Sequence, residues 1–216
     1  FAAAQPDLHP LLLNRFLVLA EWSGIEKIIL CINKMDLYAG DGASFLALYE
    51  DIGYPVLRVS AHTGEGLAAL REHLCGETSV FAGPSGVGKS SLMNAIDPSL
   101  ALQTGEVSDK IKRGRHTTRV AELLPYAGGY VVDTPGFSAM ELTELDTAVL
   151  PDCFPEFRPY LGHCRFQPCS HSHEPDCAVK AAVASGAIAE ERYQAYLSIL
   201  SEIKENQVIA RKKEYK

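Results

Sequence analysis

Residues 83–91 fill every fixed position of the phosphate-binding pattern Gly-x-x-x-x-Gly-Lys-Ser. The run reads Gly83-Pro84-Ser85-Gly86-Val87-Gly88-Lys89-Ser90-Ser91. Its glycines let the backbone curl so that successive amides point at phosphate oxygens, and a following helix adds its N-terminal dipole. We expect Lys89 to reach the β- and γ-phosphates and the Ser90 hydroxyl to bind Mg²⁺. A chance glycine turn is disfavoured because the run lies between a predicted strand and a predicted helix, so it predicts a nucleoside triphosphate site.

A second group, Asn33-Lys34-Met35-Asp36, has residues that could select the base of that nucleotide. The Asp36 carboxylate can accept hydrogen bonds from the ring NH and the amino group of guanine, a pair that adenine cannot donate. A buried acceptor left unpaired rejects the wrong base strongly. We expect Lys34 to lie along the base plane and Asn33 to tie this loop to the phosphate loop.

Four polar residues after a strand could also form a plain turn. The run Ser60-Ala61-His62 follows the next predicted strand, however, and its backbone is expected to contact the guanine oxygen. The combination of the two runs favours GTP over ATP.

Two further segments are expected to respond to the γ-phosphate. In Asp133-Thr134-Pro135-Gly136, Asp133 is expected to hold Mg²⁺ through water, and the Gly136 amide to sense the γ-phosphate. Residues 114–119, which read G-R-H-T-T-R, lie between this motif and the phosphate loop. A threonine in this segment is expected to close on Mg²⁺. Thr118 is favoured because it directly precedes Arg119, and Thr117 is the alternative. A flexible basic loop is the other interpretation of the segment.

The catalytic group is less clear from the pattern. Phe137 stands where many GTPases keep a glutamine that orients water, and a phenylalanine cannot do this. His116 is our candidate for positioning the water. Lys89 and Thr118 complete the set of predicted catalytic residues. A histidine that contacts solvent or RNA is an equally open interpretation.

Three of the six cysteines fall within fourteen residues, beside His171 and His173. With no secretory signal, this clustering indicates a metal site rather than disulfides. Three thiolates and one imidazole suit tetrahedral Zn²⁺ with no open position, which is a structural site. The thiolates would come from Cys164, Cys169 and Cys177, with Cys153 and His173 as further candidates. The surrounding proline-rich segment offers little apolar core, so we expect the metal to replace one.

Hydrophobic patterning supplies the elements that must position these residues. We predict strands over 28–32, 54–59, 78–82, 121–124 and 129–133, and helices over 11–21, 67–74, 90–96 and 188–211. Strands that alternate with helices imply a mainly parallel sheet with helices on both faces.

Composition and charge narrow the class of protein. The 216 residues suffice for one ordinary domain and a small second one. A net charge of −7 argues against a surface that binds nucleic acid throughout, although basic groups within 110–119 and 211–216 can still meet phosphates. For the second group, plain solvated charge is equally open. We see no run approaching about 18 apolar residues and no signal peptide, hence no membrane association. The chain starts at Phe1 without an initiator Met, so we expect a fragment.

The motifs occur in a rotated order. An ordinary GTPase has its phosphate loop first, whereas here the base-reading runs at 33–36 and 60–62 precede the loop. Such permutation is physically reasonable because domain termini often lie close together. The predicted fold class is therefore α/β: a circularly permuted P-loop GTPase domain over 1–145, and a small, mostly helical zinc-binding domain with a long amphipathic helix over 146–216.

The permuted motifs, the G-R-H-T-T-R segment, D-T-P-G-F at 133–137 and the C-x4-C-x-H-x5-C cluster resemble the RsgA family of bacterial small ribosomal subunit biogenesis GTPases. The resemblance covers essentially the whole chain, and its cluster spacing favours His171 as the fourth metal ligand. It implies a GTPase that binds the small (30S) ribosomal subunit and its rRNA, acts in late maturation, and hydrolyses GTP to GDP faster on the subunit. It further implies Mg²⁺ with GTP, one structural Zn²⁺, and a cytoplasmic monomer. Family members also carry an N-terminal OB-fold, which these residues do not include.

Two other functions compete with this prediction. The chain could be an RNA-binding zinc module whose nucleotide site is only structural, or a P-loop ATPase or nucleotide kinase. The run at 33–36 argues against the last two. Stimulation of hydrolysis by small subunits would distinguish the GTPase from the RNA-binding module.

Overall fold

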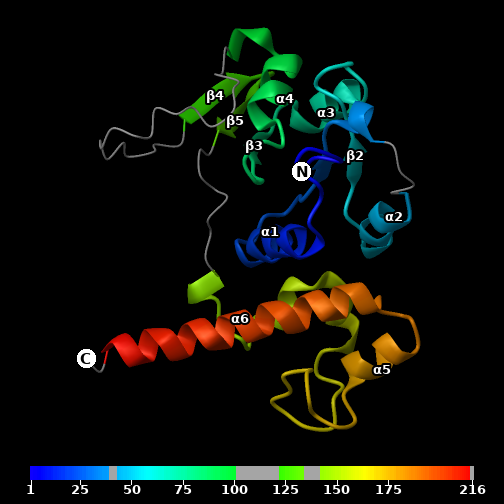
Figure 1. The fold of residues 1–216 in the computed structure, drawn as a ribbon, viewed down its shortest axis with the longest axis vertical. Helices are drawn as coiled ribbons and strands as arrows, with labels where there is room; N and C mark the ends of the chain where they lie inside the picture. The colour runs from blue at the N-terminus through cyan, green and yellow to red at the C-terminus, as the bar shows by residue number, and fades with distance from the viewer. Residues whose placement is uncertain (39–42, 101–121, 134–141, 215–216) are drawn as a thin grey trace. The chain divides into compact units, whose positions relative to one another are not determined.

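The computed structural model describes residues 1–38, 43–100, 122–133 and 142–214 (Figure 1). The chain forms two compact units, each built from segments that are distant in sequence. Unit 1 comprises Phe1–Leu8, Ile29–Glu50 and Tyr54–Ala139, and unit 2 comprises His9–Ile28, Asp51–Gly53 and Met140–Lys216.

Unit 1 contains all five predicted strands, arranged in two sheets among the described residues. In the first sheet, β1 (Leu30–Ile32) pairs in parallel with β2 (Val56–Arg58). In the second, β5 (Gly129–Asp133) lies between β3 (Thr78–Phe81), which runs parallel to it, and β4 (Glu122–Tyr126), which runs antiparallel. Two of the three strand pairings are therefore parallel, as predicted for the sheet.

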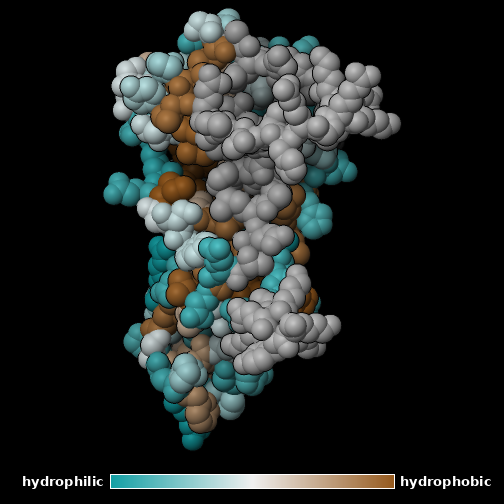
Figure 2. All heavy atoms as spheres, turned by 90° about the vertical axis from the view of Figure 1, so that its left-hand side faces the viewer, coloured by the Kyte–Doolittle hydropathy of each residue, from teal (hydrophilic) through white to brown (hydrophobic). Residues whose placement is uncertain are grey.

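The β4–β5 hairpin is closed by Ala127 and Gly128, which both have positive φ (45° and 84°). Positive φ at both central residues is the requirement of the type I′ turn, whose twist matches that of the flanking strands. The short hairpin places Val131 on the buried face of β5, whereas Leu123 and Tyr130 are about half exposed on the opposite face, at 58% and 47%. Hydrophobic side chains that reach the molecular surface are visible in Figure 2.

Helices α3 (Leu67–Leu74) and α4 (Lys89–Ile96) pack against the buried face of this sheet. Their apolar residues share a core with the two sheets, formed by Val59, Leu67, Leu70, Leu74, Leu92, Met93, Ile96, Tyr126 and Val131. Most of α2 (Ala43–Ile52), which the sequence patterns did not predict, also belongs to this unit, as do short 3-10 turns at Met35–Leu37 and Pro98–Leu100. The missed signal was the three-residue spacing of Leu46 and Tyr49, which are both buried.

Unit 2 is helical. It contains α1 (Pro10–Trp22), α5 (Ala178–Ala184), the long helix α6 (Glu190–Glu214) and 3-10 helices at Leu142–Glu144, Leu150–Cys153 and Pro155–Tyr160. None of the helices in the described ranges combines the length and hydrophobicity needed to cross a bilayer.

Unit 2 has a hydrophobic core of its own, so the expectation that a metal replaces the core was wrong. The ring of Tyr196 meets those of Phe154 and Phe157 at centroid distances of 5.3 and 5.0 Å, and Val18 of α1 joins the same cluster. The error arose because α1 and α6, which lie at the two ends of the sequence, bring apolar residues to the proline-rich segment.

Helix α1 belongs to unit 2 although it lies near the start of the chain. A division of the sequence at residue 145 does not predict this assignment. The reason is a buried polar link between distant elements. Arg192 of α6 is 1% exposed, and its guanidinium donates to the Glu156 carboxylate at 2.6 Å and to the Asn14 side chain of α1. The same guanidinium lies 4.6 Å from the Phe154 ring centroid. A buried arginine must be paired in this way, so the link fixes α1 on this unit.

Candidate functional site

The phosphate loop has the local context that the sequence predicts. It leaves β3 and opens α4 at Lys89, and Gly86 and Gly88 have φ values of 81° and 91° that disfavour residues with a Cβ. The Lys89 ammonium group donates to the carbonyls of Gly83 at 2.7 Å and Pro84 at 3.0 Å. The cation is thus held at the loop whose phosphates it is predicted to contact.

The Asn33 side chain joins three loops. It is 1% exposed; its Nδ2 donates to the Val87 carbonyl at 2.9 Å, and its Oδ1 accepts from the Ala61 amide at 3.1 Å. A Cβ on Gly88 would lie only 2.4 Å from this Nδ2, so the glycine permits the close approach. The three runs singled out in the sequence, at 33–36, 60–62 and 83–91, therefore meet at one side chain.

Lys34 and Asp36 are held by neighbouring loops as well. Lys34 has a left-handed backbone (φ 61°), which is uncommon for a residue with a Cβ, and its Nζ donates to the carbonyls of Gly86 at 2.7 Å and of Gln5. The Asp36 carboxylate accepts a 2.5 Å hydrogen bond from Ser60 Oγ, which in turn accepts from the amide of His62. These contacts fix the orientation of the carboxylate predicted to read the base.

Part of the predicted site falls outside the described residues, namely His116, Thr117, Thr118, Gly136 and Phe137. For Asp133 the structure describes the backbone only. It ends β5 and is in register with Phe81, the last residue of β3, which Ala82 separates from the phosphate loop. Of the two predicted Mg²⁺ ligands, Ser90 follows β3 and Asp133 ends β5. These strands are parallel neighbours, so their carboxyl ends meet at one sheet edge.

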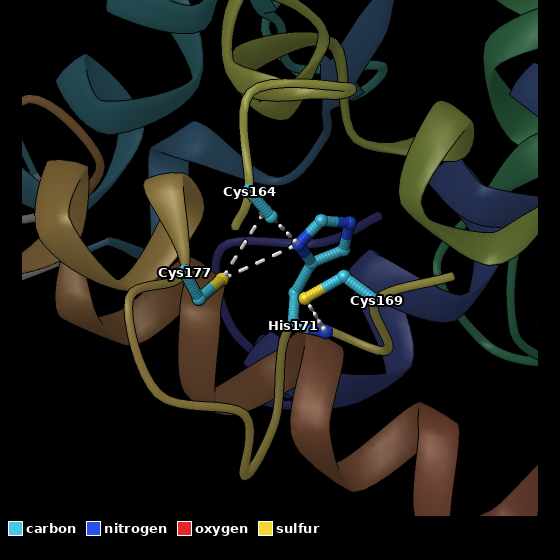
Figure 3. A group of neighbouring side chains, drawn as sticks. All are labelled: Cys164, Cys169, His171 and Cys177. Atoms are coloured by element: carbon cyan, nitrogen blue, oxygen red, sulfur yellow. Dashed lines mark hydrogen bonds between the residues drawn. The ribbon is translucent and has the colours of Figure 1, made fainter. Parts of the chain in front are cut away.

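The second candidate site is the predicted Cys/His cluster, shown in Figure 3. One ligand atom from each of four residues lies within 4.8 Å of all the others, a set made up of Cys164, Cys169, His171 and Cys177. The two sulfurs of Cys164 and Cys177 are 3.8 Å apart, and His171 Nδ1 is 3.5 and 3.4 Å from them. Four converging soft donors could hold a metal ion.

The two other ligand candidates lie outside this cluster. Cys153 is buried in its own 3-10 helix, where its thiol donates to the Val149 carbonyl, and the His173 side chain is 81% exposed. Among the clustered thiols, burial raises the pKa of Cys169 to about 12. A bound cation would stabilise the thiolate instead, and the amides of His171 and Ala178, which donate to the sulfurs of Cys169 and Cys164, favour the same form.

Known proteins with a similar sequence or fold agree with the class of protein that these two sites indicate. A family model described as RsgA GTPase matches residues 1–143. This chain belongs to the RsgA GTPase family. The GTPase class and the family predicted from the motifs are therefore confirmed.

Two relatives of the family extend the match through the Cys/His cluster. Both are named small ribosomal subunit biogenesis GTPase RsgA. The relative from Alkaliphilus metalliredigens (strain QYMF) is 48% identical over 208 residues, and the one from Geobacillus thermodenitrificans (strain NG80-2) is 50% identical over 209 residues. Each match covers 95% of this chain and 71% of the relative.

Solved structures confirm the fold class of this RsgA GTPase. The crystal structure of YjeQ from Thermotoga maritima has a TM-score of 0.79 and 40% identity, over 94% of this chain and 69% of that one. The crystal structure of YloQ, described as a circularly permuted GTPase, has a TM-score of 0.76 and 40% identity, over 95% and 66%. The rotated motif order is thus the permutation of this fold.

Two residues that hold the loop of the Cys/His cluster could not be found from the sequence pattern. The hydroxyls of Tyr193 and Tyr196 on α6 donate to the carbonyls of His171 and Ser170, at 2.9 and 2.7 Å. The pattern predicted both tyrosines only as members of an apolar helix face. No local signal reveals these bonds because they join residues 22 and 26 positions apart.

Proposed function

We propose that this RsgA GTPase binds the small (30S) ribosomal subunit and its rRNA, and hydrolyses GTP to GDP during late maturation of that subunit. The observation that carries the proposal is the 48–50% identity, over 95% of the chain, to relatives named for small-subunit biogenesis. We further propose that the chain acts as a cytoplasmic monomer whose hydrolysis is faster on the subunit.

The loops that meet at Asn33 would form the guanine nucleotide site. Phosphates would contact residues 83–91, and the base would contact residues 33–36 and 60–62. Ser90, Thr118 and Asp133 would hold Mg²⁺, and Gly136 would sense the γ-phosphate. Lys89, Thr118 and His116 would act on the reacting phosphate, with His116 positioning the water.

Lys89 tests the phosphate half of this assignment. Replacing Lys89 by Ala is expected to abolish measurable GTP hydrolysis, because no other group would bridge the β- and γ-phosphates from the loop. Phosphate release from GTP is the measurement. Lys204→Ala, an exposed lysine on α6, is the matched control and should keep the wild-type rate. Normal turnover by Lys89→Ala would refute the assignment.

The donor set and its spacing support Zn²⁺ as the metal, in one structural site. Bonds of about 2.3 Å from a tetrahedral zinc ion to two thiolates place the sulfurs about 3.8 Å apart. The Cys164 and Cys177 sulfurs have this separation. All four positions are taken by side chains, so the ion would not offer a site for substrate. Unit 1 would then be the GTPase domain, and unit 2 the zinc-binding domain with α1 included.

Turnover with and without purified small subunits tests the proposed function. We expect slow hydrolysis by the chain alone and a marked increase with small subunits, but not with large subunits at the same concentration. Absence of turnover in every mixture would contradict the proposal and favour an RNA-binding module with a structural nucleotide site.

A further inference from the structure

Helix α6 holds the loop that carries the metal cluster by two tyrosine hydroxyls. Tyr196 OH donates to the Ser170 carbonyl, and Tyr193 OH donates to the His171 carbonyl. Tyr196 is fully buried and Tyr193 is 8% exposed, so the bond to the His171 carbonyl is buried and the bond to the Ser170 carbonyl is partly buried. The two tyrosines lie three positions apart on one face of the helix, with their rings stacked at a centroid distance of 6.3 Å.

These two bonds fix the backbone of a single ligand. The Ser170 carbonyl belongs to the peptide plane before the His171 Cα, and the His171 carbonyl belongs to the plane after it. Pinning both planes determines φ and ψ of His171, which has φ of 54°, in a region that costs free energy for a residue with a Cβ. In this conformation the His171 amide donates to Cys169 Sγ at 3.4 Å, while Nδ1 faces the sulfurs of Cys164 and Cys177.

The rest of the loop is fixed from its other side. The Glu174 carboxylate accepts hydrogen bonds from the amides of Ser170 and Ser172 and from the Ser170 hydroxyl, at 2.7–3.1 Å. Lys180 of α5 donates to the Glu174 carbonyl at 3.0 Å. The loop thus has two anchors, and only the tyrosines reach the peptide groups of the histidine ligand on both sides.

We propose that Tyr193 and Tyr196 are positioning residues of the metal site, which hold His171 in its ligand geometry and thereby raise the affinity for a divalent metal. Partners that orient metal ligands typically contribute 10–100-fold in affinity. The proposal rests on the zinc site of the proposed function.

The test is the Zn²⁺ affinity of the full chain, measured by competition with a chromophoric chelator, for the wild type, both Tyr→Phe variants and the double variant. Removing the hydroxyls keeps the ring contacts of Tyr196 with Phe154 and Phe157, so the core should persist. We expect a several-fold loss for each single variant and about a tenfold or larger loss for the double variant, with faster metal release.

Tyr160→Phe is the matched control. Tyr160 also packs against the core of unit 2, and no hydrogen bond in the described part of the chain joins its hydroxyl to the metal loop. A role in general stability alone would lower the unfolding temperature and leave Zn²⁺ affinity, measured well below that temperature, unchanged.

Each outcome separates the inference from the proposed function. If the wild type fails to bind Zn²⁺, the proposed zinc site is wrong. If the wild type binds and the double variant, folded by circular dichroism, binds equally well, only the positioning role is overturned. Should the double variant not fold in excess Zn²⁺, the single variants decide: unchanged affinity in both, or an equal loss in Tyr160→Phe, overturns the proposal.

Discussion

Replacing Asp36 by Asn is expected to weaken GTP and GDP binding by about 10⁴-fold and to transfer the preference to xanthine nucleotides. Asp36 is exposed in the structure, and a bound base would bury its carboxylate; sites that leave such a group unpaired reject the wrong ligand by about this factor. The carboxylate has one oxygen engaged by Ser60 Oγ at 2.5 Å, and the Asn33 contacts hold the whole loop against the phosphate loop. An amide in this position would direct its NH₂ group at the guanine donors, whereas xanthine offers an acceptor there.

The measurement is equilibrium binding of GDP and xanthosine diphosphate to the wild type and to Asp36→Asn. Asp51→Asn is the control, because Asp51 is an exposed carboxylate at the end of α2 and should keep the wild-type preference. An unchanged ratio of the two affinities in Asp36→Asn would refute the assignment of Asp36 to the base.

Replacing Cys177 by Ser is expected to lower Zn²⁺ affinity by more than about 100-fold, because it removes a ligand rather than a group that orients one. Metal binding and folding are coupled, so the loop from Leu161 to Cys177 should become sensitive to protease. Helix α6 should keep most of its helicity, since the ring of Tyr196 would still meet those of Phe154 and Phe157, although Cys164 and Cys177 belong to the same core. Chelation of the metal from the wild type should reproduce this pattern.

The same site gives a pH dependence with a definite sign. Burial raises the pKa of the Cys169 thiol to about 12, so the metal-free thiol is protonated near neutral pH. Binding must release this proton, and the Zn²⁺ affinity of the wild type should fall as the pH is lowered. Chelator competition at several pH values measures the Zn²⁺ affinity. Cys75→Ser is the control, because Cys75 lies in unit 1 outside the cluster.

For the substitution of Cys177, an intact Zn²⁺ affinity in Cys177→Ser would contradict the ligand set.

Local patterns gave much of the fold and of the site. The phosphate loop and the strands could be predicted because each depends on residues adjacent in sequence. The Cys/His spacing identified the cluster, although not that His171 presents Nδ1 to the sulfurs. The contact of Asn33 with the phosphate loop could be anticipated because a guanine nucleotide site needs both motifs at one place.

Contacts between distant segments could not be predicted where no pair of motifs links the two segments. Nothing local to α1 shows that Asn14 meets Arg192 across 178 positions, which is why the domain division by sequence left α1 with the GTPase domain. The tyrosine bonds of α6 escaped for the same reason. The roles of His116 and Thr118 stay predictions.

Nucleotide binding to the wild type, with GDP and ADP titrated in parallel at equal Mg²⁺, tests most directly whether the loops joined by Asn33 form one guanine nucleotide site. We expect GDP to bind at least about a thousandfold more tightly than ADP, because only guanine can donate its hydrogen-bond pair to Asp36. Equal affinity for the two nucleotides, or binding of neither, would contradict the account.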